Sequence, residues 1–309
     1  MNNTTNTSVT LHINSIINVV SLFMDCVALL TCMIYLCIII VRVIQLKVYR
    51  RRRYFNISLI LSINIISDIF VKALLQTTHV SYPTFARDFL MVDKSADKTI
   101  YQMRAYMLWS INGVVYWSYT LVAFYRFVRV IYPTKVWLQR SFIYVYVLIP
   151  GEHLAVFSAM LVIPFVFESI RIFPGEVYCT VIPLPCYSIV YASFVMFNIP
   201  FNIVCIFYYL ITRRLRQTTA VRREQDLYRR DFIVIRRMIV NMILLIIAII
   251  PYGIVALKGY IEHNFYSLTE RIEWLSSSLS SCLFAFTLPF ITPKLREFLK
   301  QNRIMPANN

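Results

Sequence analysis

The chain has 309 residues, of which 59% are hydrophobic and only 15% charged, and its mean hydropathy is +0.63. A soluble domain carries roughly 45–50% apolar and about 25% charged residues, so most of this chain faces something other than water. The net charge is +16, but the basic residues lie in short runs between apolar stretches, which excludes a nucleic-acid-binding surface and favours one integral membrane domain.

Seven apolar runs follow one another, each long enough for the roughly 20 residues that a helix needs to cross the hydrocarbon core. Inside lipid every backbone group must be hydrogen-bonded within its own segment, which makes these runs helices. We therefore predict an all-α membrane protein, with a seven-transmembrane helix bundle over 16–292, an extracellular segment at 1–15 and a cytoplasmic tail at 293–309. The expected spans are 16–41, 54–77, 103–130, 141–168, 184–212, 232–257 and 272–292.

The orientation follows from the basic residues, which are concentrated in every second connection. Most of the 31 Lys and Arg lie after the first, third and fifth runs and in the tail. The positive-inside rule places these segments in the cytoplasm and the amino terminus outside the plasma membrane. The amino-terminal segment agrees, because it carries three glycosylation sequons, at Asn2, Asn3 and Asn6.

The second run contains ionisable residues, which are costly inside lipid and usually functional. Asp68 has Asn64 one turn before it and Lys72 one turn after it, all on one stripe of the expected helix. This intramembrane polar site leaves two alternatives for Lys72. It forms an ion pair with Asp68, or its long side chain extends to the headgroups.

The later runs carry an arginine, prolines and tyrosines at defined places. Arg126 lies close to the end of the third run, and Pro133 follows seven residues after it. Further positions of this kind are Pro200, Tyr208, Pro251, Tyr252 and Pro289. Residues 293–300 place apolar side chains on one helical face and cations on the other, which predicts a short amphipathic helix on the cytoplasmic leaflet.

Together these residues resemble the rhodopsin-like (class A) G-protein-coupled receptors, as a divergent member in which Ile249 stands where the family has a toggle tryptophan. The resemblance implies a receptor, not an enzyme, that transduces an extracellular ligand to a heterotrimeric G protein by outward movement of span six. It implies no cofactor. It also implies a lock between Arg126 and Asp231, whose release lets Tyr208 meet Arg126.

The ligand is less well defined by the sequence. The position that binds amines in aminergic receptors holds Leu108, and Cys282 replaces the retinal lysine of opsins, while charged outer connections favour a peptide. The side chains expected to face the cavity are Trp109, Asn112, Tyr116, Tyr252, Trp274 and Ser278. Because Tyr101 replaces the family's tethering cysteine, Cys179 and Cys186 could bridge each other.

A multi-span transporter or channel-like membrane protein is the main alternative. A transporter would be expected to have helices broken by glycine or proline near the midplane, and 5 glycines in 309 residues do not favour it. A membrane-embedded enzyme or a metal site would need clustered His, Asp or Cys residues. The four histidines are scattered, and no metal is expected.

Overall fold

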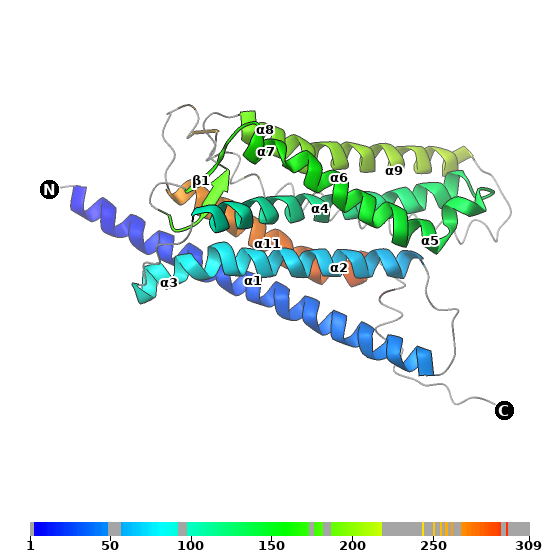
Figure 1. Ribbon diagram of the computed structural model, residues 1–309, viewed down its shortest axis with the longest axis horizontal. Coiled ribbons are helices and arrows are strands. Elements are labelled where there is room, and N and C mark those ends of the chain that lie inside the picture. The colour runs from blue at the N-terminus through cyan, green and yellow to red at the C-terminus, as the bar shows by residue number, and fades with distance from the viewer. Residues whose placement is uncertain are drawn as a thin grey trace.

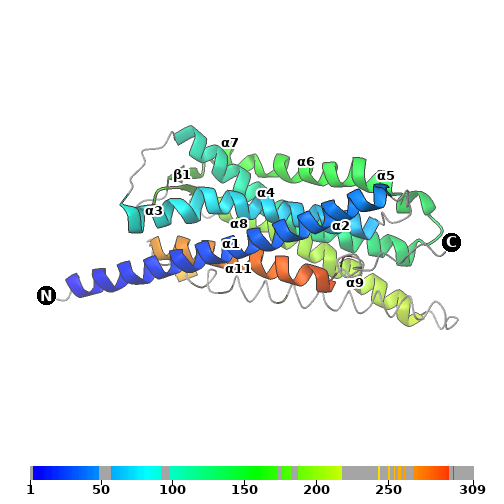
Figure 2. The ribbon, with the colours of Figure 1, turned by 90° about the horizontal axis from the view of Figure 1, so that it is seen from below.

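The computed structural model is a bundle of long helices with one short β-hairpin (Figure 1). It describes residues 3–48, 57–91, 98–172, 176–181, 187–217 and 267–291, and single residues at 243, 250, 254, 257, 258, 261 and 295. The first helix, α1 (Asn3–Val48), crosses the others obliquely, and its amino-terminal part extends beyond them (Figures 1 and 2). Helix α1 therefore starts within the segment that was expected to precede the first span.

The remaining elements that the structure describes follow α1 in chain order. They are α2 (Ile57–Gln76), η2 (Thr77–Ser81), α3 (Tyr82–Leu90), α4 (Lys98–Ile131), η3 (Val136–Gln139), α5 (Ser141–Ile143), η4 (Tyr144–Leu148), α6 (Ile149–Met160), α7 (Val162–Phe165), β1 (Ile170–Ile172), β2 (Cys179–Val181), α8 (Tyr187–Ser193), η5 (Phe194–Asn198), α9 (Ile199–Gln217) and α11 (Ser267–Ile291). Helix α4 lies among the others and packs on α2, α6, α9 and both strands, whereas α1 packs mainly on α2 and α11.

Three of the long helices contain a π-helical turn, and each turn is closely followed by a proline. The turns η2, η4 and η5 end two residues before Pro83, Pro150 and Pro200. Proline has no N–H to donate, and its ring clashes with the carbonyl four residues earlier, which in each case lies within the π turn. A wider i→i+5 turn accommodates this clash without ending the helix. The prolines therefore shape these helices without dividing them.

The prediction of a seven-span bundle is wrong. In the part of the chain that the structure describes, four helices are long and apolar enough to cross a membrane. They are Ile13–Gln45, Ile57–Leu90, Ser141–Phe165 and Tyr187–Arg214. They correspond to the first, second, fourth and fifth of the expected spans. Four such helices agree with the prediction of a membrane protein.

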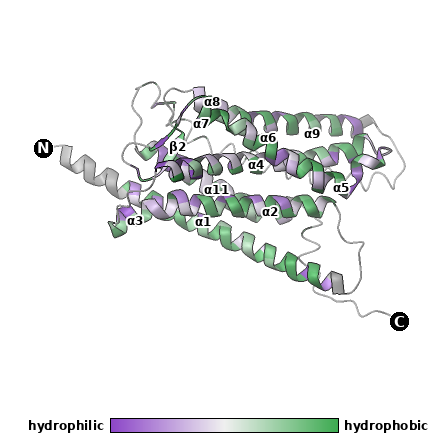
Figure 3. Ribbon diagram, viewed as in Figure 1, coloured by the Kyte–Doolittle hydropathy of each residue, from purple (hydrophilic) through white to green (hydrophobic). Residues whose placement is uncertain are grey.

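The other three expected spans are accounted for in two ways. The runs at 103–130 and 272–292 form α4 and α11, which do not have the apolar character of the four helices; α4 is visibly mixed in Figure 3. The run at 232–257 lies outside the described residues apart from four single positions, as does the expected amphipathic helix apart from Leu295.

The composition of α4 and α11 reflects packing against other helices. Helix α11 carries buried serines, among them Ser278 and Ser280, that contact polar side chains of α1 and α2. A helix can be this polar inside a bundle when its neighbours supply hydrogen-bond partners. In contrast, α1 and α6 expose large apolar side chains, such as Phe23 (65%) and Leu154 (70%), as a lipid-facing surface would.

One end of the bundle is covered by the β-hairpin. Strands β1 and β2 pair antiparallel, with Ile170 opposite Val181 and Ile172 opposite Cys179. The hairpin packs on α4, and it lies on the side of the bundle where α11 begins (Figure 1). Tyr178, immediately before β2, is fully buried and packs edge-on against Trp274 of α11, with ring centroids 6.1 Å apart. We call this end of the bundle the hairpin end.

Candidate functional site

Asp68 lies in a buried polar network between α2, α4 and α6. Its Oδ2 accepts hydrogen bonds from Ser118 Oγ at 2.7 Å and Asn64 Nδ2 at 3.0 Å, and its Oδ1 is 3.1 Å from His153 Nε2. A buried carboxylate requires such partners, because losing water is costly for a charge. Asn64 was expected beside Asp68 from the sequence, whereas Ser118 and His153 come from other helices and were not expected there.

Lys72 contacts a different helix. Its Nζ donates to the carbonyl oxygen of Ser277 at 3.3 Å and to Ser280 Oγ at 3.4 Å, both in α11. The residue is only 1% exposed, so its side chain does not extend to the surface of the bundle. Its electrostatic partner is Asp25 of α1, a fully buried acid that also accepts a hydrogen bond from Ser81 Oγ at 2.6 Å. Sequence reasoning missed Asp25, although an acid within the first apolar run was a usable signal.

Gln76 and Ser278 connect the same three helices. Gln76 Nε2 donates to Ser278 Oγ at 2.6 Å and to the Trp274 carbonyl at 3.1 Å, while Ser277 Oγ donates to Gln76 Oε1 at 3.0 Å. The hydroxyls of Ser278 and Ser21 are 2.7 Å apart. Ser278 was expected to face a ligand, but it lies in the contact between α1, α2 and α11.

A cavity of about 150 Å³ lies between α4, α11 and the continuous helix α8–η5. Four of the six side chains expected to face a ligand line it: Trp109, Asn112, Tyr116 and Trp274. The acidic residue Glu273 and three serines of α11 line it as well. Tyr252 lies outside the described residues. We call this space the tryptophan cavity.

The tryptophan cavity has polar atoms that need partners. Within the described part of the chain, Trp109 Nε1, Trp274 Nε1 and Asn112 Oδ1 are buried without a hydrogen bond. Leaving such a group unsatisfied costs roughly 1–3 kcal/mol, so these atoms favour a bound polar molecule. The two indole rings meet edge to face with centroids 6.3 Å apart. Three residues that line the cavity thus carry a buried donor or acceptor without a partner in the described part of the chain.

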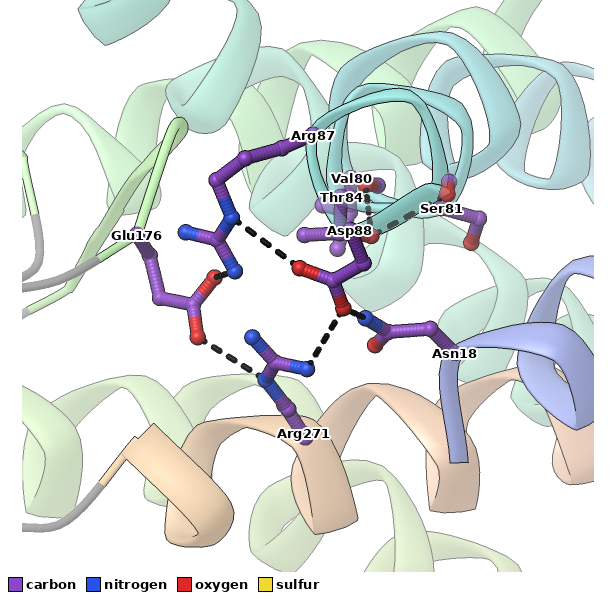
Figure 4. Close-up of polar contacts among 8 residues, drawn as sticks. All are labelled: Asn18, Val80, Ser81, Thr84, Arg87, Asp88, Glu176 and Arg271. Atoms are coloured by element: carbon purple, nitrogen blue, oxygen red, sulfur yellow. Dashed lines mark hydrogen bonds and ion pairs between the residues drawn. The ribbon is translucent and has the colours of Figure 1, made fainter. Parts of the chain in front are cut away.

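Four charged residues form a closed ring at the hairpin end (Figure 4). Arg87 contacts Asp88 at 3.1 Å and Glu176 at 2.9 Å, and Arg271 contacts the same two carboxylates at 2.9 Å each. Asn18 of α1 donates a further hydrogen bond to Asp88. The side chains of Glu176 and Arg271 are 0% and 6% exposed. This charge ring holds α3, α11 and the segment before β2 together, so these outer charges are paired within the protein.

Glu270 and Cys179 are two further buried residues at the hairpin end, and both lie outside the four candidate spans. Burial, together with the carboxylates of Glu273 and Glu176, raises the pKa of Glu270 well above its usual range. Burial also raises the pKa of the Cys179 thiol, which is free in this structure. The possible partner of Cys179, Cys186, lies outside the described residues.

The far end of the bundle holds the residues expected to switch. Arg126 of α4 and Tyr208 of α9 are 6% and 3% exposed, and they are close enough to interact electrostatically. The Pro200 carbonyl accepts a hydrogen bond from Thr120 Oγ1 at 3.4 Å, which joins the same two helices.

The other expected positions are only partly visible. Pro289 lies inside α11. Asp231 and Pro251 lie outside the described residues, as does Asn2, while Asn3 and Asn6 belong to the first turns of α1.

A comparison with models of known protein families finds no match, and no curated protein matches the sequence. A functional interpretation therefore depends on the residues and their geometry.

Proposed function

We propose that the protein is a plasma-membrane receptor, with its amino terminus outside the cell, that couples an extracellular ligand to a heterotrimeric G protein. One observation carries the proposal. Helix α4 has the unsatisfied indole of Trp109 near the hairpin end and the buried Arg126 near its other end. These residues are 17 positions apart, or about 25 Å along a helix. A central helix with a binding cavity at one end and a buried cation at the other suits signal transmission.

Two buried polar networks support a route between the ends. A ligand that hydrogen-bonds Trp274 would bias the position of α11, whose serines bind Lys72 and Gln76 of α2. Helix α2 also carries Asp68, which is bonded to Ser118 of α4. A ligand can shift the equilibrium between the inactive and active states of the receptor only by the difference between its affinities for those two states. A difference of about 1.4 kcal/mol, the order of one hydrogen bond, shifts it tenfold.

The proposed ligand is a peptide that places one residue in the tryptophan cavity. The cavity, at about 150 Å³, is smaller than the roughly 300–1,000 Å³ of sites that enclose a drug-sized molecule. It therefore suits a single polar side chain or a chain terminus. At the cytoplasmic end, Arg126 is proposed to leave Asp231 and meet Tyr208 when the receptor is active.

A second-messenger screen in cells against a peptide library tests this proposal. Trp274→Phe keeps an aromatic side chain but removes the N–H donor together with one of the two fused rings, so it should weaken the response at least fivefold, or by roughly 1 kcal/mol. Arg126→Ala should abolish the response at equal surface expression. Arg129→Ala removes an exposed cation one turn away and is the matched control, which should respond normally. A response that survives Arg126→Ala would refute the proposal, and ligand uptake without signalling would favour a transporter.

A further inference from the structure

A second, larger hollow lies on the outside of the bundle. This apolar groove, of about 650 Å³, lies between α4, α6 and α9, and Leu121, Phe124 and Phe207 are among its walls. Gly151 and Ala155 of α6 line the groove and are exposed, so it opens beside them. Both α6 and α9 belong to candidate membrane spans. The groove therefore opens toward the bilayer and is separate from the tryptophan cavity.

The groove offers one free hydrogen-bonding atom among its described lining residues. Trp117 Nε1 donates to a carbonyl of η5 at 3.1 Å, and Thr120 Oγ1 donates to a carbonyl one turn earlier at 3.3 Å. The remaining polar wall residue is Glu152. Its Oε1 is 2.8 Å from Ser118 Oγ, whereas its Oε2 is buried and has no partner in the described part of the chain.

Ser118 Oγ links Glu152 to Asp68. It lies 2.7 Å from Asp68 Oδ2 and 2.8 Å from Glu152 Oε1, and it accepts a hydrogen bond from Asn64 Nδ2 at 2.9 Å. A hydroxyl group has one proton, so it donates to only one of the two carboxyl groups at a time. Whichever of them takes this proton, the bond involves Oε1 of Glu152, and Oε2 still needs a donor.

The depth of Glu152 restricts the molecule that can supply this donor. The residue lies near the middle of the candidate span Ser141–Phe165. At 1.5 Å per residue it is roughly 16–20 Å from either end of that helix. A hydroxyl at the level of the headgroups does not reach this atom. The donor must be carried by the part of a lipid that lies deep in the hydrocarbon.

We propose that this groove binds an uncharged sterol with a hydroxyl on its side chain, and that this hydroxyl donates to Glu152 Oε2. A sterol keeps its ring hydroxyl near the headgroups and extends its side chain toward the middle of the bilayer. The apolar walls match the ring system, and the volume falls within the usual range of about 300–1,000 Å³ for small-molecule sites. No basic residue is among the described wall residues, so a phospholipid headgroup or a fatty-acid carboxylate would lack a counter-charge.

The test uses the full chain in phosphatidylcholine nanodiscs and radiolabelled 25-hydroxycholesterol, with cholesterol as the matched ligand without the side-chain hydroxyl. The hydroxysterol should bind saturably, and cholesterol should bind roughly fivefold more weakly because it leaves the Glu152 acceptor unsatisfied. The assay contains neither G protein nor agonist, so its outcome is independent of the proposed receptor function.

A substitution that closes the groove gives the second arm. A Cβ at Gly151 would meet no atom within 4 Å, so Gly151→Leu can be accommodated and should occupy the groove. We expect it to weaken hydroxysterol binding roughly tenfold or more. Ser158→Leu adds the same side chain at an exposed position of α6 outside the groove and should bind normally. Helix content and Tm of both variants establish that they are folded.

Equal binding of the two sterols would overturn the proposal, as would undiminished binding by folded Gly151→Leu. Absence of saturable binding to the unmodified chain would overturn it as well. If Gly151→Leu instead changes the oligomeric mass and no sterol binds, the groove belongs to an interface with a second copy of the chain.

Discussion

Glu176→Gln should destabilise the protein by about 3 kcal/mol, because it removes one of the two anions from a buried ring of four charges. The carboxylate of Glu176 is 0% exposed and contacts two guanidinium groups at 2.9 Å each. At an effective dielectric constant of about 20, one such contact is worth roughly 5–6 kcal/mol before desolvation is subtracted. Glutamine keeps the shape of the side chain, so the loss reports charge rather than packing. Asp88 would then be the one anion left among the four residues of the ring.

Chemical unfolding in detergent, followed by tryptophan fluorescence, measures this change. Glu168→Gln is the control, since it makes the same substitution at an exposed position close to the hairpin and should change stability by less than about 0.5 kcal/mol. If Glu176→Gln costs no more than the control, the charge ring is screened like a surface ion pair. The ring would then not stabilise the contact of the hairpin segment with α3 and α11.

Three further predictions follow from the same structure. Cys179 is buried with a raised thiol pKa, so iodoacetamide should modify it far more slowly in the native protein than after denaturation, and equal rates would contradict its burial. The raised pKa of Glu270 means that the folded state keeps a proton that the unfolded chain loses above about pH 4.3. The free energy of unfolding should therefore fall as pH rises from there toward the pKa of Glu270 in the folded state. Glu270→Gln should make the free energy of unfolding depend less steeply on pH in this range. An unchanged dependence would show that another group titrates. Gly151→Ala should stabilise α6 by up to about 1 kcal/mol. Gly113→Ala should instead destabilise the protein, because its Cβ would lie 3.0 Å from the stiff side chain of Val156. A gain in Tm for both variants would contradict the close packing at Gly113.

The features that could be predicted from sequence are those encoded within a single segment. Four expected spans coincide with helices of the required length and apolar character, because hydropathy is a local property. The contact between Asn64 and Asp68 is likewise local, since one helical turn separates them. Trp109, Asn112 and Tyr116 line one cavity because their spacing of three and four residues places them on one side of α4.

The features that were missed depend on contacts between segments. His153 and Ser118 reach Asp68 from two other helices, and nothing in their own neighbourhoods indicates this. The charge ring joins Arg87 to Arg271 through the segment before β2, so charges expected to meet a ligand are used internally. The runs at 103–130 and 272–292 are not among the four candidate spans because polar residues of α4 and serines of α11 serve packing between helices.

The most direct test of the proposed receptor function is agonist-stimulated nucleotide exchange by a purified heterotrimeric G protein, with the full chain reconstituted in nanodiscs. An agonist from the peptide screen should accelerate exchange with the unmodified chain and with Arg129→Ala, but not with Arg126→Ala. Agonist binding, measured separately, should be retained in Arg126→Ala, because the cavity lies about 25 Å away along α4. Exchange that is equally fast with Arg126→Ala, or absent with an unmodified chain that binds agonist, would contradict the proposal that α4 connects the tryptophan cavity to a G protein.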